Sequence, residues 1–205
     1  MLIPWFPGIL LFLSRLGRAQ DQDESMMEWT TAYSLEGEQE IAKNTLLTTL
    51  PTLDKEWKVT FELKPTSYKY RGYAQVIHFT TGGKGGKGGQ LGDRTPALWI
   101  HKTLGVYIVT TINGKPNVGK HFRSKRPALN EWTAVEISQV KKGSIYIFSL
   151  MMNNEVLWSI RNVKPSQFSD VKVYAASPWF AVQAGSIKGL KIEQPGSKEI
   201  NCILF

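Results

Sequence analysis

The segment from Lys55 to Pro65, KEWKVTFELKP, gives the clearest indication of the fold. Tryptophan, valine, phenylalanine and leucine occupy its odd positions from 57 to 63, and charged residues or threonine occupy the even positions between them. Because successive side chains of a β-strand point to opposite faces, this alternation places all four apolar side chains on one face. The pattern predicts a strand with one face in the core and the other in water.

Similar short segments follow one another along most of the chain, and none shows a helix-length apolar period. The turn sequences Asn113-Gly114 and Asn153-Asn154 separate several of them. We therefore predict an all-β protein, an antiparallel two-sheet β-sandwich of the jelly-roll type. The strands are expected at residues 29–35, 46–50, 55–65, 74–80, 97–101, 104–112, 132–140, 144–151, 155–160, 171–175 and 187–192, with a turn or short helix at 37–43 and a basic connection at 113–127.

The length and composition suit a single domain with short tails. The chain has 205 residues, of which 42% are hydrophobic, enough for one sizeable core. We place the domain at residues 29–193, after a polar leader at 20–28 and before a tail at 194–205. A formal net charge of +8 favours anionic partners such as sulfated glycans or acidic matrix.

The first residues resemble a targeting signal. Leu2 to Leu13 form an apolar run of signal-peptide length, and Gly17-Arg18-Ala19 supplies a small-x-small cleavage pattern. We expect residues 1–19 to be a signal peptide, the mature chain to be secreted, and no stable membrane insertion to remain. A retained signal-anchor is the alternative, because no lysine or arginine precedes the apolar run. Secretion also argues against nucleic acid as a partner.

The single cysteine, Cys202, leaves no partner for a disulfide within the chain. It opens the ending Cys202-Ile203-Leu204-Phe205, which also matches a prenylation pattern. Prenylation is cytosolic and conflicts with the secretion signal. We therefore interpret Cys202 as a chance match to that pattern or as a thiol that links two chains into a homodimer.

Three segments resemble the concanavalin A-like jelly-roll superfamily, in particular laminin-G-like and lectin-like secreted modules. These are the strand at 56–65, the segment Asn130–Ile137 followed by Asn153-Asn154, and the ending at 171–192 with its G-x-I-x-x-L-x-I pattern. The resemblance implies two curved antiparallel sheets, with a ligand bound on the concave face or at a rim of loops. It indicates fold more than function, because this sandwich hosts lectins, matrix modules and hydrolases.

A glycine-rich loop at residues 82–92 joins two expected core strands and ends at Asp93. It lacks the G-K-[ST] ending of a phosphate-binding P-loop, and no helix is expected after it. Its glycine N–H groups, with Lys84 and Lys87, form a candidate anion site, and a flexible linker is the alternative interpretation. Many members of the resembled superfamily hold calcium at a loop rim, and Asp93 is the candidate calcium ligand.

Polar residues beside this loop and one tryptophan far from it suggest a glycan site. Trp179, in an expected loop, is a candidate for stacking on a sugar ring, whereas Trp57, Trp99, Trp132 and Trp158 are expected in the core. His78 and His101 flank the central loop and are expected to lie near each other, either as ligand contacts or as structural histidines. The candidate ligand-binding residues are Asp93, Arg94, Trp179, His78, His101 and Asn113.

A second group of candidates is basic. Lysines and arginines cluster in the connection at 113–127 and add to the two lysines of the glycine loop. We expect them to form a salt-sensitive patch for anionic glycans. Its members are Lys84, Lys87, Lys115, Lys120, Arg123, Lys125 and Arg126.

The sequence gives little support for catalysis. No E-x-D-x-x-E triplet of the kind used by glycoside hydrolases of this fold occurs, and no G-x-S-x-G occurs. Glu131 and Glu136 are the nearest pair of carboxylates, five residues apart. We therefore predict a secreted module, not an enzyme, that binds carbohydrate or extracellular matrix. A structural, self-assembling extracellular protein and a glycan-active hydrolase are the alternatives.

Overall fold

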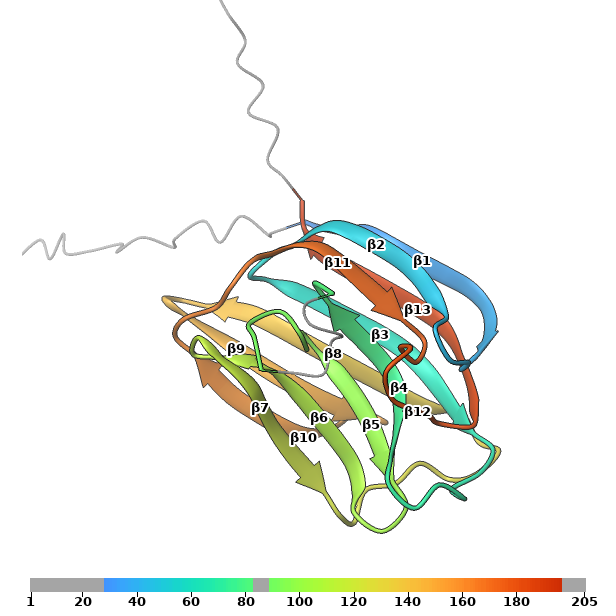
Figure 1. Ribbon diagram of the computed structural model, residues 1–205. Helices are drawn as coiled ribbons and strands as arrows, with labels where there is room; N and C mark the ends of the chain where they lie inside the picture. The colour runs from blue at the N-terminus through green and yellow to red at the C-terminus, as the bar shows by residue number, and fades with distance from the viewer. Residues whose placement is uncertain (1–27, 83–88, 197–205) are drawn as a thin grey trace, which may run out of the picture.

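The computed structural model describes residues 28–82 and 89–196, and these residues form a two-sheet β-sandwich without helices (Figure 1). The predicted all-β jelly roll is confirmed. The six-stranded sheet has the spatial order β1 (Trp29–Glu40), β13 (Gly185–Pro195), β3 (Trp57–Pro65), β8 (Thr133–Lys142), β9 (Ile145–Met152) and β10 (Glu155–Asn162). All its neighbouring strands are antiparallel.

The second sheet has seven strands. Its order is β2 (Leu46–Leu53), β11 (Phe168–Tyr174), β4 (Tyr73–Thr80), β5 (Ala97–His101), β6 (Gly105–Ile112) and β7 (Lys115–Phe122). The short β12 (Ala181–Val182) pairs with β4 in parallel. The core between the two sheets is continuous and includes the fully buried residues Leu63, Phe79, Ile137 and Phe148.

The alternating sequence of β3 places its apolar side chains in the core, as predicted. Its odd positions are buried and its even positions are half-buried at the outer surface of the six-stranded sheet. β4 behaves differently, because every residue from Ala74 to Thr80 is buried. Ring contacts show the reason, since the segment at 175–182 places Trp179 and Phe180 against the outer side of β4.

Two local expectations were wrong. β1 continues to Glu40 where a turn or short helix was expected, because it pairs with β13 as far as Glu40 and Ser186. The basic connection at 113–127 contains β7, because Asn113 and Gly114 both have positive φ and turn the chain back along β6. The last strand ends at Pro195, beyond the predicted domain end at residue 193.

Several predictions concern residues outside the described ranges. The signal peptide, most of the acidic leader, the tip of the glycine loop with Lys84 and Lys87, and the Cys202 ending all lie there. Within residues 28–82 and 89–196, no helix is long and apolar enough to cross a membrane.

Candidate ligand-binding face

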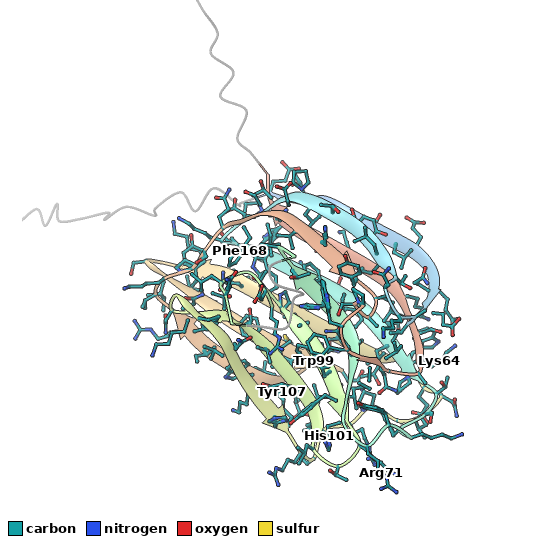
Figure 2. All side chains as sticks on the ribbon, viewed as in Figure 1. Lys64, Arg71, Trp99, His101, Tyr107 and Phe168 are labelled. Atoms are coloured by element: carbon teal, nitrogen blue, oxygen red, sulfur yellow. The ribbon has the colours of Figure 1, made fainter. Side chains whose placement is uncertain are left out.

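The seven-stranded sheet carries a row of rings on the side that faces away from the core. Strand pairing produces this row, because Trp99 of β5 lies opposite Tyr107 of β6, and Tyr107 lies opposite His121 of β7. At the end of the same strands, Tyr73 of β4 lies opposite His101 of β5. Figure 2 shows Trp99, Tyr107 and His101 close together on this sheet. We call the surface formed by Tyr73, Trp99, His101, Tyr107 and His121 the aromatic face.

The rings of the aromatic face contact one another without a break. Tyr107 and His121 stack with ring centroids 4.0 Å apart and planes 9° apart. Tyr107 also lies 5.8 Å from Trp99 and 5.2 Å from Tyr73. Trp99 is buried at the back, Tyr107 and His121 are half-buried, and Tyr73 is 38% exposed. Solvent therefore reaches adjoining parts of the Tyr73, Tyr107 and His121 rings, while Trp99 stays covered.

A glycine on β7 makes room for Tyr107. A Cβ atom at Gly119 would lie 2.9 Å from the Tyr107 hydroxyl oxygen and 2.9 Å from the Ile108 carbonyl oxygen. Real Cβ atoms essentially never approach other atoms so closely. The absence of a side chain at Gly119 therefore lets Tyr107 lie across β7, which broadens the aromatic face toward the sheet edge.

A cation lies at one end of this row. The Arg94 guanidinium carbon is 5.2 Å from the Trp99 ring and 5.4 Å from the Phe180 ring. Its Nη1 donates a hydrogen bond of 3.2 Å to Asn117 Oδ1, which projects from β7. Burial lowers the pKa of Arg94, and the guanidinium remains charged at neutral pH because its ordinary pKa is so high. The structure thus holds a positive charge beside the aromatic rings.

Asp93 holds the turn that carries Arg94. Its side chain is only 3% exposed, and Oδ2 accepts a hydrogen bond of 3.1 Å from the Gln90 N–H. Its carbonyl oxygen lies 2.7 Å from Nε2 of the fully buried His78, whose protonated Nε2 donates to it. Burial lowers the pKa of His78 to about 4, so this ring is neutral at pH 7. Asp93 and His78 therefore fix the turn that carries Arg94.

Hydrogen-bonding groups occupy the other end of the aromatic face. The Tyr73 hydroxyl lies 3.2 Å from His121 Nε2. Nδ1 of His101 accepts hydrogen bonds from the backbone N–H groups of Thr103 at 3.1 Å and Leu104 at 3.2 Å. The His101 proton therefore resides on Nε2, where it can donate to a ligand. Burial, with smaller contributions from Arg123 and His101, lowers the pKa of His121 and keeps that ring neutral.

The predicted ligand-binding residues are only partly brought together. Asp93, Arg94, His78 and Trp179 lie at one end, where Trp179 contacts the rings of His78 at 5.9 Å and Tyr174 at 6.1 Å. The expected proximity of the two histidines is wrong, because His78 pairs with Ala97 whereas His101 pairs with Tyr73, at the far end of β4.

Asn113 has a different position and role. Its backbone N–H donates to Asn162 Oδ1 at 2.8 Å, and its Oδ1 accepts from the Val163 N–H at 2.6 Å. Its amide thus connects the β6–β7 turn to the β10–β11 segment.

The sequence analysis missed Trp99 and Tyr107 as site residues. Trp99 was expected in the core, but it belongs to a separate small cluster with Ala97 and Val109 on the outer side of the sheet. The signal that could have found these residues is the alternation of Trp99 with His101, continued across the predicted hairpin by Tyr107. Trp132 was also expected in the core, and it lies half-buried between Lys64 and Lys188.

The described members of the predicted basic patch have different neighbours. Lys120 lies on the same side of β7 as Val118 and Phe122, which pack against the core, so it lies on the opposite side from His121. Lys125 forms an ion pair of 2.6 Å with Glu155. Arg126 lies over the Tyr68 ring, and Lys115 and Arg123 are exposed.

The carboxylates do not form a metal site in the described part of the chain. No group of three or more histidine, cysteine, aspartate or glutamate side chains that could hold a metal ion occurs among residues 28–82 and 89–196. Glu131 lies in the segment before β8, whereas Glu136 lies within β8. A calcium ion at Asp93 stays a prediction, and Asp93 belongs to no group of three or more metal-ligating side chains among the described residues.

Comparison with known proteins identifies the fold of this chain and finds no related sequence. No protein-family model matches the sequence, and no curated protein sequence matches it significantly. The structure is similar to the CBM40 domain of the Ruminococcus gnavus IT-sialidase bound to α2,3-sialyllactose, with 15% identity and a TM-score of 0.53 over 80% of this chain and 91% of that one. It is also similar to the binding domain of botulinum neurotoxin serotype D, with 12% identity and a TM-score of 0.51 over 82% of this chain and 43% of that one.

A third similar structure is a variant of human galectin-16, with 12% identity and a TM-score of 0.48 over 74% of this chain and 99% of that one. The strand order and the first two of these similarities agree with the resemblance found in the three sequence segments. The chain has the concanavalin A-like jelly-roll fold.

Proposed function

We propose that this protein binds carbohydrate and that the sugar packs on the aromatic face. The observation that carries the proposal is the continuous surface of the partly exposed rings of Tyr73, Tyr107 and His121, which lies beside the buried Trp99 and has hydrogen-bond donors at both ends. Such a surface left open to solvent is unusual for a sheet that needs no partner. The CBM40 domain with the same fold, described as bound to sialyllactose, supports carbohydrate as the class of ligand.

The chemistry of the face suits a sugar. The C–H face of a pyranose is apolar and packs on an aromatic ring, while its hydroxyl groups need donors and acceptors at the edges of that ring. Tyr107 and Tyr73 supply the half-exposed rings. Arg94 and Asn117 at one end, and His101 at the other, supply groups within reach of hydroxyls.

A preference for acidic sugars forms the finer part of the proposal. Arg94 is the charged group on the face itself, and its planar guanidinium matches a carboxylate better than an ammonium would. We place the ligand outside the cell, on glycans or matrix, because of the apolar run from Leu2 to Leu13. Detection of the chain, cleaved after Ala19, in the medium of expressing cells would test this location.

A glycan array tests the proposal. The full chain is expected to bind a restricted set of glycans, and Tyr107→Ala is expected to lose most of that binding because it removes the central ring. Tyr146→Ala is the matched control, since Tyr146 is a half-buried tyrosine on β9 of the other sheet. Equal loss in both variants, or no bound glycan at low or high salt, would contradict the proposal. Preferred binding of neutral sugars would refute only the acidic preference.

A further inference from the structure

Three loops meet at one end of the sandwich, and two of them, together with residues 182–184, line a second cavity that is separate from the aromatic face. The loops lie at residues 66–72, 102–104 and 123–132, between β3 and β4, β5 and β6, and β7 and β8. Figure 2 shows Arg71 and His101 at this end of the molecule. The cavity has a volume of about 380 Å³ and is lined by Tyr68, Lys69, Tyr70, Ala74, Ile100 and Lys102, among others. This volume is within the range of small-molecule sites.

Hydrogen bonds tie the three loops together. The Tyr68 hydroxyl donates to the Pro127 carbonyl at 2.6 Å, and burial raises the pKa of this hydroxyl to about 12, so it stays protonated. Arg126 Nη1 donates to the Lys102 carbonyl at 2.5 Å, and its guanidinium lies 5.0 Å from the Tyr68 ring. The cavity is therefore formed before any ligand arrives, which reduces the entropy lost on binding.

The cavity combines aromatic and cationic groups. Ala74 and Ile100 form an apolar floor, and Tyr70 is a large aromatic side chain that is 54% exposed. Lys69 and Lys102 bring two ammonium groups from different loops, and both lysines are exposed. None of the described residues that line the cavity is an aspartate or glutamate. The charges thus favour an anion attached to a ring.

We propose that this loop-end cavity is a second ligand site that binds a sulfated sugar, with the ring against Tyr70 and the sulfate held by Lys69 and Lys102. Charge-assisted hydrogen bonds from lysine are roughly twice as strong as neutral ones. Ligand binding at this cavity does not depend on carbohydrate binding at the aromatic face.

Isothermal titration calorimetry with galactose 6-sulfate, galactose and inorganic sulfate tests the site on the full chain. Galactose 6-sulfate is expected to bind more tightly than either fragment, and the Lys69→Gln/Lys102→Gln variant is expected to lower its affinity by about tenfold or more. Tyr70→Ala is expected to weaken the sulfated sugar but not inorganic sulfate. Lys164→Gln is the matched control, because Lys164 is an exposed lysine beside Gly114 at the opposite end of β6.

Three results would overturn this inference. Inorganic sulfate that binds as tightly as galactose 6-sulfate would show that the sugar ring contributes nothing. An equal loss of affinity in Lys164→Gln would reduce the effect to general charge. A loss in Tyr107→Ala would move the ligand to the aromatic face. Failure of the glycan array with retained, Lys69-dependent binding of the sulfated sugar would instead contradict only the proposed function.

Discussion

The outer face of the six-stranded sheet is covered by ion pairs, whereas the outer face of the seven-stranded sheet is covered by rings. On the first, Lys188 pairs with Glu62 at 3.0 Å and Lys58 pairs with Glu193 at 3.0 Å. Trp132 on that face is enclosed by the ammonium groups of Lys64 and Lys188, at 4.4 and 4.3 Å. Charges on that face are thus largely satisfied by one another.

This difference separates a face that completes the fold from a face that is open for binding. Exposed ion pairs contribute little to stability, but they leave few unpaired groups for a ligand. On the seven-stranded sheet, Arg94 is placed over Trp99, and Tyr107 and Tyr73 stay accessible. The cost of keeping such a surface in water is the physical argument for a ligand there.

The largest expected difference between the faces is in stability. Trp99→Ala removes a ring that is 2% exposed and contacts His78, Tyr107 and Phe180, so it should lower the free energy of unfolding by about 3–5 kcal/mol. Trp132→Ala on the six-stranded sheet should cost only about 1 kcal/mol. Urea unfolding of both variants checks this comparison, and equal losses would contradict the deeper burial of Trp99.

The next effect depends on pH. The pKa of His78 falls from 6.5 to about 4 in the folded protein, so between these values the unfolded chain binds more protons. The stability contributed by neutral His78 is fully present above pH 6.5 and is lost as the pH falls toward 4, by roughly 3 kcal/mol.

His78→Gln can preserve the hydrogen bond to the Asp93 carbonyl without a titrating ring. Unfolding free energies of both proteins at pH 7 and pH 4 are therefore expected to show a smaller drop in the variant. Because the carboxylates titrate in both proteins, the difference between them isolates His78. Identical drops would mean that His78 titrates normally.

A subtler change tests the geometry of the aromatic face. Gly119→Ala places a methyl group against the Tyr107 hydroxyl, so it should shift that ring and lower glycan affinity by about tenfold. Gly143→Ala is less informative as a control, because Gly143 has a φ of +60° and strains any side chain. Gly37→Ala has nothing within 4 Å and is the better control. Unchanged affinity in Gly119→Ala would mean that Tyr107 does not touch the sugar.

The smallest expected effect concerns the six-stranded sheet. Glu62→Gln breaks the ion pair with Lys188, and because both side chains are largely exposed, the stability should change by less than about 1 kcal/mol. Glycan binding should be unaffected. Thermal unfolding and the glycan array would check both expectations. A loss of glycan binding would mean that the sugar binds on the six-stranded sheet instead of on the aromatic face.

The fold was largely predictable, since alternation reports directly which side chains face the core. Alternation predicted the segment at 55–65 best. This segment becomes β3, and one of its faces is turned toward solvent. The extension of β1 could not be predicted, because pairing with β13 determines it.

The site was less predictable. Trp99 and Tyr107 are separated from His121 by the β6–β7 hairpin, and only strand register brings them into contact. Arg94 was chosen from its position after the central loop, but its stacking on Trp99 depends on the turn held by His78. A single sequence does not encode these pairings in a readable pattern.

Chemical-shift mapping with a glycan identified on the array tests the central claim most directly. We predict shifts concentrated on β4 to β7, including the Trp99 indole N–H and the amides of Tyr107 and His121, with β3, β8 and β13 unchanged. Shifts concentrated on β3, β8 and β13, or spread over both sheets, would contradict the account.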